Sequence, residues 1–317
     1  MKRIVERLLP NGERKQVHPF HVSLEGLENL VLCRDDEDYD AFVKFICLSA
    51  RRKNVILIIY AVVSNHCHAA ILAACQQDAD NFASELKKMC SMWFSRKYGK
   101  KGVLQKTDVK AIWIDSDWYL RNALAYIPRN ALDNGCEIKT YQWSGYSAMF
   151  CKSVFPFGTR SVAHLKKREK KLLMHTDDNL SGVSWMIDAS GYLIPSSICD
   201  YEYLEQAFEN DEAFFLKTLG GLNAEEMKYR LVDSPRIMRP DSEFFKEVND
   251  ISIRWYKMNV DDLPLQKKLR LIPYLFRTNK TSVNQLARIL SIERSTVEHC
   301  IHPKSSGKII TNDKEGL

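Results

Sequence analysis

Runs of apolar positions, broken by short polar stretches, divide the first half of the chain into strands and helices. An apolar run from Val55 to Val63 is followed, after Ser64 and Asn65, by a second run from His66 to Ala73. Apolar runs of this length that are bounded by turn-forming residues are typical of buried strands. Alternating positions predict an earlier strand over residues 17–24 and a later one over 109–114.

Helical spacing fills the gaps between these predicted strands. An acidic opening at residues 36–38 predicts a helix that runs to about residue 52, because acidic side chains favour the first turn of a helix. Residues 78–98 also have helical spacing, and a further helix is predicted around Tyr126. The order of elements predicts an α+β fold, in which helices cover one face of an antiparallel sheet.

Two histidines are the first candidates for chemistry. His66 and His68 lie one residue apart in a predicted strand, so their side chains point to the same face, while Cys67 points to the core. Two imidazoles on one face can bind a divalent metal. A structural pair bound by hydrogen bonds is the alternative interpretation.

A second candidate group follows on the predicted helix. Tyr126 and Asn130 are four residues apart and share a helix face. A phenol is a nucleophile, and an amide oxygen can complete the coordination of a metal without adding charge. Pro128 removes a helical hydrogen bond, so we expect the helix to kink near Tyr126 or to begin there. Tyr119, seven residues earlier, is the rival nucleophile.

At these residues the chain resembles the HUH single-tyrosine transposases, in particular their REP-associated branch (RAYT). The stretches that carry the resemblance are 63–71 and 126–135, with further pieces in the family's order at 21–23, 97–104, 114–120 and 143–148. The resemblance covers about the first half of the chain. It implies an RRM/ferredoxin-like sheet and a catalytic Tyr126. It also implies Mg²⁺ or Mn²⁺ held by His66, His68 and Asn130.

Three positions depart from the family's pattern. Glu25 stands where the family has a basic residue, Ser64 stands where it has a proline, and Ala131 replaces the proline expected after Asn130. The acid at Glu25 and the proline at 128 favour an alternative function. In this alternative, a domesticated DNA-binding regulator has lost its catalytic activity.

A modest positive charge fits a polyanionic partner. The 317 residues carry a net charge of +6, with a pI near 8.7. Single-stranded or hairpin DNA is the partner that the resemblance implies. Basic residues flank the candidate site, and four of them are candidate phosphate contacts: Lys106, Lys110, Arg121 and Arg129.

The second half of the chain predicts a different kind of structure. We expect a catalytic domain over 1–155, a connecting region over 156–240 whose role the sequence does not indicate, and a helical domain over 241–317. Residues 281–301 resemble a helix-turn-helix. Its second helix would present Arg294, Ser295 and Thr296 to the major groove of duplex DNA.

Nine cysteines without a Cys-x-x-Cys pair predict reduced thiols in a cytoplasmic protein. The longest apolar region is broken at residues 64–66, which favours a hairpin over a membrane span. We expect a monomer or homodimer. The favoured activity is metal-dependent cleavage and rejoining of single-stranded DNA, as in transposition. A metal-dependent phosphodiesterase that uses only the histidines is a third hypothesis.

Overall fold

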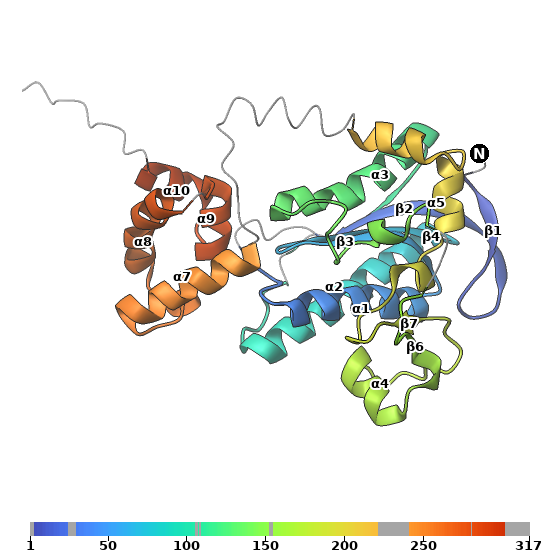
Figure 1. The fold of residues 1–317 in the computed structure, drawn as a ribbon, viewed down its shortest axis with the longest axis horizontal. Coiled ribbons are helices and arrows are strands. Elements are labelled where there is room, and N and C mark those ends of the chain that lie inside the picture. The colour runs from blue at the N-terminus through green and yellow to red at the C-terminus, as the bar shows by residue number, and fades with distance from the viewer. Residues whose placement is uncertain are drawn as a thin grey trace, which may run out of the picture.

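A computed structural model gives the fold of the chain (Figure 1). The residues that it describes are 3–24, 30–104, 107, 109–151, 155–220, 241–279 and 281–301.

An antiparallel sheet forms the centre of the first lobe. Its strands are β2 (Arg14–Leu24), β3 (Ile56–Val62), β4 (Cys67–Ala73) and β5 (Val109–Trp113). They lie side by side in the order β5-β2-β4-β3. A further strand, β1 (Val5–Leu8), pairs with the first residues of β2. The sequence predicted the four central strands but neither β1 nor the early start of β2.

Helices lie on both faces of this sheet (Figure 1). Helices α1 (Asp36–Arg52) and α2 (Gln76–Tyr98) pack on one face, where α1 contacts β3 and α2 contacts β2, β4 and β5. Helix α3 (Asp117–Arg129) lies on the other face, against β3 and β4. The βαββαβ order from β2 to β5 confirms the predicted α+β class with a ferredoxin-like arrangement. Helix α3 also covers part of the opposite face of the sheet, over β3 and β4.

A buried carboxylate fixes the start of α1 to the end of α2. Asp38 is 0% exposed and accepts hydrogen bonds from the Trp93 indole at 2.8 Å and from the backbone N–H of Arg34 at 2.9 Å. The Tyr98 hydroxyl donates to it as well, and Lys97 lies 2.9 Å away. These partners compensate the cost of burying a charge.

Residues 155–220 pack on the same core as the sheet. They include two short strands, β6 (Arg160–Ser161) and β7 (Met186–Ile187), together with α4 (Lys167–Met174) and α5 (Tyr201–Ala207). Apolar side chains of this region, among them Tyr203 and Phe208, are fully buried in the first core.

Helices in the described part of residues 241–301 build a second lobe beside the sheet (Figure 1). They are α7 (Asp241–Tyr256), α8 (Leu265–Thr278), α9 (Val283–Leu290) and α10 (Arg294–Ile301). This lobe has a separate core, to which the first lobe contributes Val31. None of the described helices has the length and apolar character needed to cross a membrane.

His175 provides a test of the packing between α4 and the α1–α2 layer. Its ring lies 4.6 Å from that of Trp93, and burial together with Lys44 lowers its pKa from 6.5 to about 4. The unfolded chain therefore gains a proton here near pH 6.5, and the folded protein does so only near pH 4. We expect the free energy of unfolding to fall as the pH is lowered across this range.

His175→Asn should flatten this pH dependence, measured by urea unfolding between pH 7 and 4. His299→Asn, which changes an exposed histidine, is the control. If the free energy of unfolding of His175→Asn falls with decreasing pH as steeply as that of the unchanged protein, His175 does not cause the acid sensitivity.

Candidate functional site

The alternation of side chains along β4 separates the site from the core. Cys67 is 2% exposed on the side of α1 and α2, and burial raises its pKa to about 12. His66 and His68 flank Cys67, and their rings lie 5.0 Å apart. The structure therefore confirms that Cys67 faces the core and that the two histidines lie together.

A third histidine joins the pair from the neighbouring strand. In the β2–β4 ladder, Ser23 lies opposite His68, so His21 on β2 is its diagonal neighbour. His21 Nε2 lies 3.2 Å from His68 Nδ1, within hydrogen-bond distance. This contact occupies Nδ1 of His68 and directs its Nε2 to other partners. Burial, with the neighbouring rings of His66 and His21, holds the pKa of His68 well below its ordinary value, so its imidazole is neutral at neutral pH.

His66 lies between two amide oxygens. Its Nδ1 lies 2.8 Å from Asn65 Oδ1, and its Nε2 lies 3.2 Å from Asn130 Oδ1. The orientation of the Asn130 amide is determined because its Nδ2 donates to the carbonyls of Tyr126 and Ile127, both at 3.1 Å. A neutral imidazole carries only one N–H. In the tautomer whose proton is on Nδ1 and directed to Asn65, the lone pairs of His66 Nε2 and Asn130 Oδ1 face each other.

Two facing acceptors are satisfied by a proton or by a metal cation between them, so this donor set fits a cation. A divalent cation here would be held by His66 Nε2 and Asn130 Oδ1, which lie 3.2 Å apart. Within the described residues, no group of three or more His, Cys, Asp or Glu side chains is placed to hold a metal. The ligand set that the resemblance implies, His66, His68 and Asn130, consists of two imidazoles and one amide.

Tyr126 extends from α3 towards the histidines. Its ring lies 5.3 Å from the ring of His68 and 6.2 Å from that of His21. The helix begins at Asp117 and continues through Pro128 to Arg129, where a 3-10 turn over Asn130–Asn134 follows. The helix therefore does not begin near Tyr126, and that half of the expectation is wrong, while the expected kink stays a prediction. Pro128 lies inside the last turn of α3, where it has no N–H to donate to the Leu124 carbonyl.

The rival nucleophile Tyr119 has a different environment. It is partly buried, and its pKa is raised by burial and by the carboxylate of Asp115. A raised pKa disfavours the phenolate that attack requires. The position of Tyr126 beside the histidines therefore favours it as the nucleophile.

The four candidate phosphate contacts differ in position. The guanidinium of Arg129 lies 5.8 Å from the centre of the Tyr126 ring, which places it at the site. Arg121 instead donates to the backbone carbonyl of Ala207 at 2.8 Å and pairs with Glu209. It therefore links α3 to α5, away from the histidines, because five residues along a helix turn it to another face. Lys106, Glu25 and the side chain of Lys110 lie outside the described residues.

The predicted helix-turn-helix corresponds to α9 and α10, joined by a turn in which Ser291 adopts φ of 53°. Leu286, Ala287, Ile292 and Val297 are buried in the core of this lobe. Arg294 and Ser295 are exposed and Thr296 is half-buried, all in the first turn of α10. Arg294 pairs with Glu298 at 2.8 Å.

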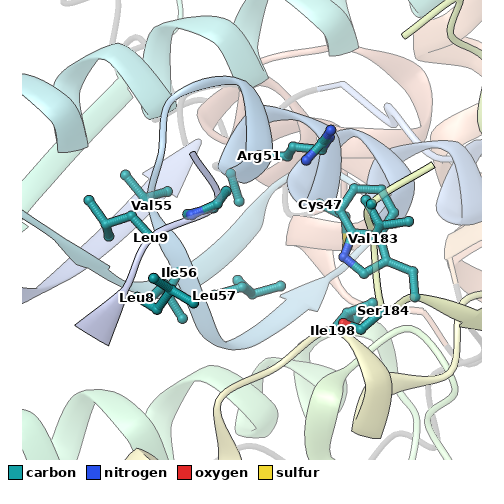
Figure 2. A pocket seen from close by; sticks show the side chains of 14 residues that line it. Leu8, Leu9, Cys47, Arg51, Val55, Ile56, Leu57, Val183, Ser184 and Ile198 are labelled. Atoms are coloured by element: carbon teal, nitrogen blue, oxygen red, sulfur yellow. The ribbon is translucent and has the colours of Figure 1, made fainter. Parts of the chain in front are cut away.

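A cavity of about 220 Å³ lies apart from this site (Figure 2). It is bounded by β1, α1, β3 and the 182–198 segment, and its walls include Leu8, Cys47, Arg51 and Leu57. None of the candidate site residues lines it.

Two further residues belong to the site. From the sequence, His21 is a possible rival ligand that more plainly suits a structural or DNA contact, and the register of β2 against β4 brings it to His68. Asn65 lies next to His66 in the chain, and its amide accepts from Nδ1 of that ring. Such an outer hydrogen bond selects the nitrogen of a histidine that remains available for a metal.

We expect the protein to bind Mn²⁺ through this group, and His66→Ala to weaken binding by at least about tenfold in calorimetric titration. Cys67→Ala is the matched control, because it changes the next residue, the first of β4, whose side chain points to the opposite face, and it should keep the affinity. Equal loss in both variants would indicate general damage to β4 instead of the loss of a ligand.

Compared with protein-family models, with curated proteins and with solved structures, the chain matches none. Its function is therefore inferred from the geometry of the histidines, Tyr126 and Asn130.

Proposed function

We propose that this protein cleaves and rejoins single-stranded DNA with Tyr126 as the nucleophile, as in transposition at hairpin or repeat sequences. The observation that supports this most is the arrangement around α3. Tyr126 lies beside His68, while Asn130, one turn later, faces His66 at 3.2 Å. A nucleophile and a cation-binding group are thus held by one short helix against one strand.

The reaction is an exchange of phosphodiester bonds. The Tyr126 oxygen attacks a backbone phosphorus and forms a 5′-phosphotyrosine bond, while the bond to the 3′ oxygen breaks. The phenol loses its proton, and the departing 3′ oxygen takes one up to become a hydroxyl. A 3′-hydroxyl can later attack the phosphotyrosine, release Tyr126 and rejoin the strand without an external energy source.

Each side chain of the group has a separate task in this proposal. His66, His68 and Asn130 would hold Mg²⁺ or Mn²⁺, which supplies Lewis-acid polarisation of the scissile phosphate. His21 orients His68 through the contact between their rings. Arg129, next to the Tyr126 ring, is placed to bind a phosphate oxygen of the strand.

Labelled single-stranded DNA that can form a hairpin, mixed with the protein and Mn²⁺ or Mg²⁺, should give a covalent protein–DNA species on a denaturing gel. Tyr126→Phe should reduce it by at least about 1000-fold, because the nucleophile is lost. Tyr119→Phe is the matched control and should retain it.

Two results would contradict this proposal. A covalent species that persists in Tyr126→Phe would place the nucleophile elsewhere. Hydrolysis of the DNA without any covalent species would favour a phosphodiesterase that uses only the metal.

A second candidate function is sequence-specific binding of duplex DNA, as in a regulator without catalysis. The exposed first turn of α10 favours it, because the start of a recognition helix is the part that contacts base edges. This activity could exist with or without strand cleavage, since it uses a different lobe.

Arg294→Ala should weaken binding to the preferred duplex by about tenfold, since one good contact to a base contributes about 1–3 kcal/mol. The preferred duplex would be selected from a random library and the affinity measured by fluorescence anisotropy. Arg254→Ala, which removes an exposed arginine of α7, is the control. Equal effects of both changes would indicate attraction by charge alone.

A further inference from the structure

One buried carboxylate connects the helix-turn-helix lobe to the turn that carries His66. Asp241, the first residue of α7, is 1% exposed. Its Oδ2 accepts from the Ser64 hydroxyl at 2.6 Å and from Arg288 Nε at 2.7 Å. Its Oδ1 accepts from Gln285 Nε2 at 2.9 Å and from Arg288 Nη2 at 3.1 Å.

The partners of Asp241 belong to the two different lobes. Gln285 and Arg288 lie on α9, the first helix of the helix-turn-helix. Ser64 lies in the turn between β3 and β4, two residues before His66. A bidentate arginine–carboxylate pair has a defined geometry, so the position of α9 determines where the carboxylate meets Ser64.

Ser64 is held from two sides. Its backbone carbonyl accepts from the N–H groups of Leu32 and Cys33 at 2.7 and 2.9 Å, and its hydroxyl donates to Asp241. The side chain is 2% exposed, so water does not readily replace a lost partner. The next residue, Asn65, accepts from His66 Nδ1. A shift of Ser64 therefore passes directly to the amide that orients the His66 ring.

We propose that Asp241 is a positioning residue that sets the orientation of His66 through Ser64 and links it to the placement of α9. A role of Asp241 in catalysis rests on the function proposed above. The effect of Asp241 on the orientation of the His66 ring does not depend on that function. The same carboxylate holds α9, the first helix of the helix-turn-helix, in a constant relation to the proposed site.

A second contact between the lobes provides a matched control. Asp261, in the second lobe, pairs with Arg34 at 2.7 Å and with Lys100 at 3.1 Å. The Arg34 guanidinium also lies 4.7 Å from the ring centre of Phe245 on α7. This contact also joins the lobes through an acid, but no described hydrogen bond or ion pair of Asp261 reaches the Ser64–His66 turn. Its partner Arg34 does lie next to Cys33, which donates to the Ser64 carbonyl. Asp261→Asn should therefore weaken the interface and change the His66 ring much less than Ser64→Ala does.

The test compares Ser64→Ala, Arg288→Gln and Asp261→Asn in the full-length protein. The primary measurement is the long-range ¹H–¹⁵N spectrum of labelled histidines, which reports the hydrogen bonding of each ring nitrogen and needs neither metal nor DNA. We expect the His66 nitrogen signals to shift in Ser64→Ala and Arg288→Gln and to shift much less in Asp261→Asn. Circular dichroism checks that each variant is folded. Ser64→Ala removes only one hydroxyl group. It therefore still tests the effect on the His66 ring if Arg288→Gln proves to destabilise the second lobe.

Mn²⁺ affinity and the rate of covalent DNA attachment are the further readouts. Ser64→Ala should lower Mn²⁺ affinity by at least about tenfold and slow attachment at saturating DNA, with little change in the DNA concentration needed for half-maximal rate. His66 signals that stay unshifted in Ser64→Ala would overturn the inference, whether or not the protein cleaves DNA. Shifted signals in a protein that forms no covalent species would support the role of Asp241 and count against the function proposed above.

Discussion

The antiparallel pairing of β2 with β4 is the constraint on which the candidate site depends. The strand β4 lies between β2 and β3, and its side chains alternate between the two faces of the sheet. Cys67 therefore points to the core under α1 and α2, and His68 points to α3. The same register brings His21 to within 3.2 Å of His68. A slip of one residue would turn Cys67 to the site and both histidines to the core, so the core and the site stabilise one another.

Buried carboxylates organise the regions around this sheet. Asp38 joins the ends of α1 and α2, and Asp241 joins α7, α9 and the turn before β4. Each is almost fully buried, and each accepts several hydrogen bonds from charged or polar donors. Burying an acid without such partners would cost several kcal/mol, whereas this satisfied geometry selects one arrangement of the elements. Removing a single partner therefore affects more than one element.

The chemistry proposed for the site follows from its neutral donors. Two imidazoles and an amide add no negative charge, so a bound cation would keep its full attraction for a phosphate. Tyr126 and Arg129 lie on α3, and Asn130 follows directly at the end of this helix. The helix packs on the strand that carries His68. Nucleophile, phosphate contact and ligands are therefore held by adjacent regular elements, which limits their relative movement.

The sequence alone determined the four central strands, the two helices that cover one face of them and the residue types of the site. Strand periodicity paired His66 with His68 and turned Cys67 inward, and the acidic opening at residues 36–38 marked the start of α1, because these patterns are local. The function suggested by the resemblance remains a proposal. Tertiary structure decided that His21 contacts His68, that Arg121 faces α5, that α3 continues through Pro128, and that Asp241 joins the lobes. These results depend on strand register and on contacts between residues as many as 177 positions apart, which no local pattern encodes.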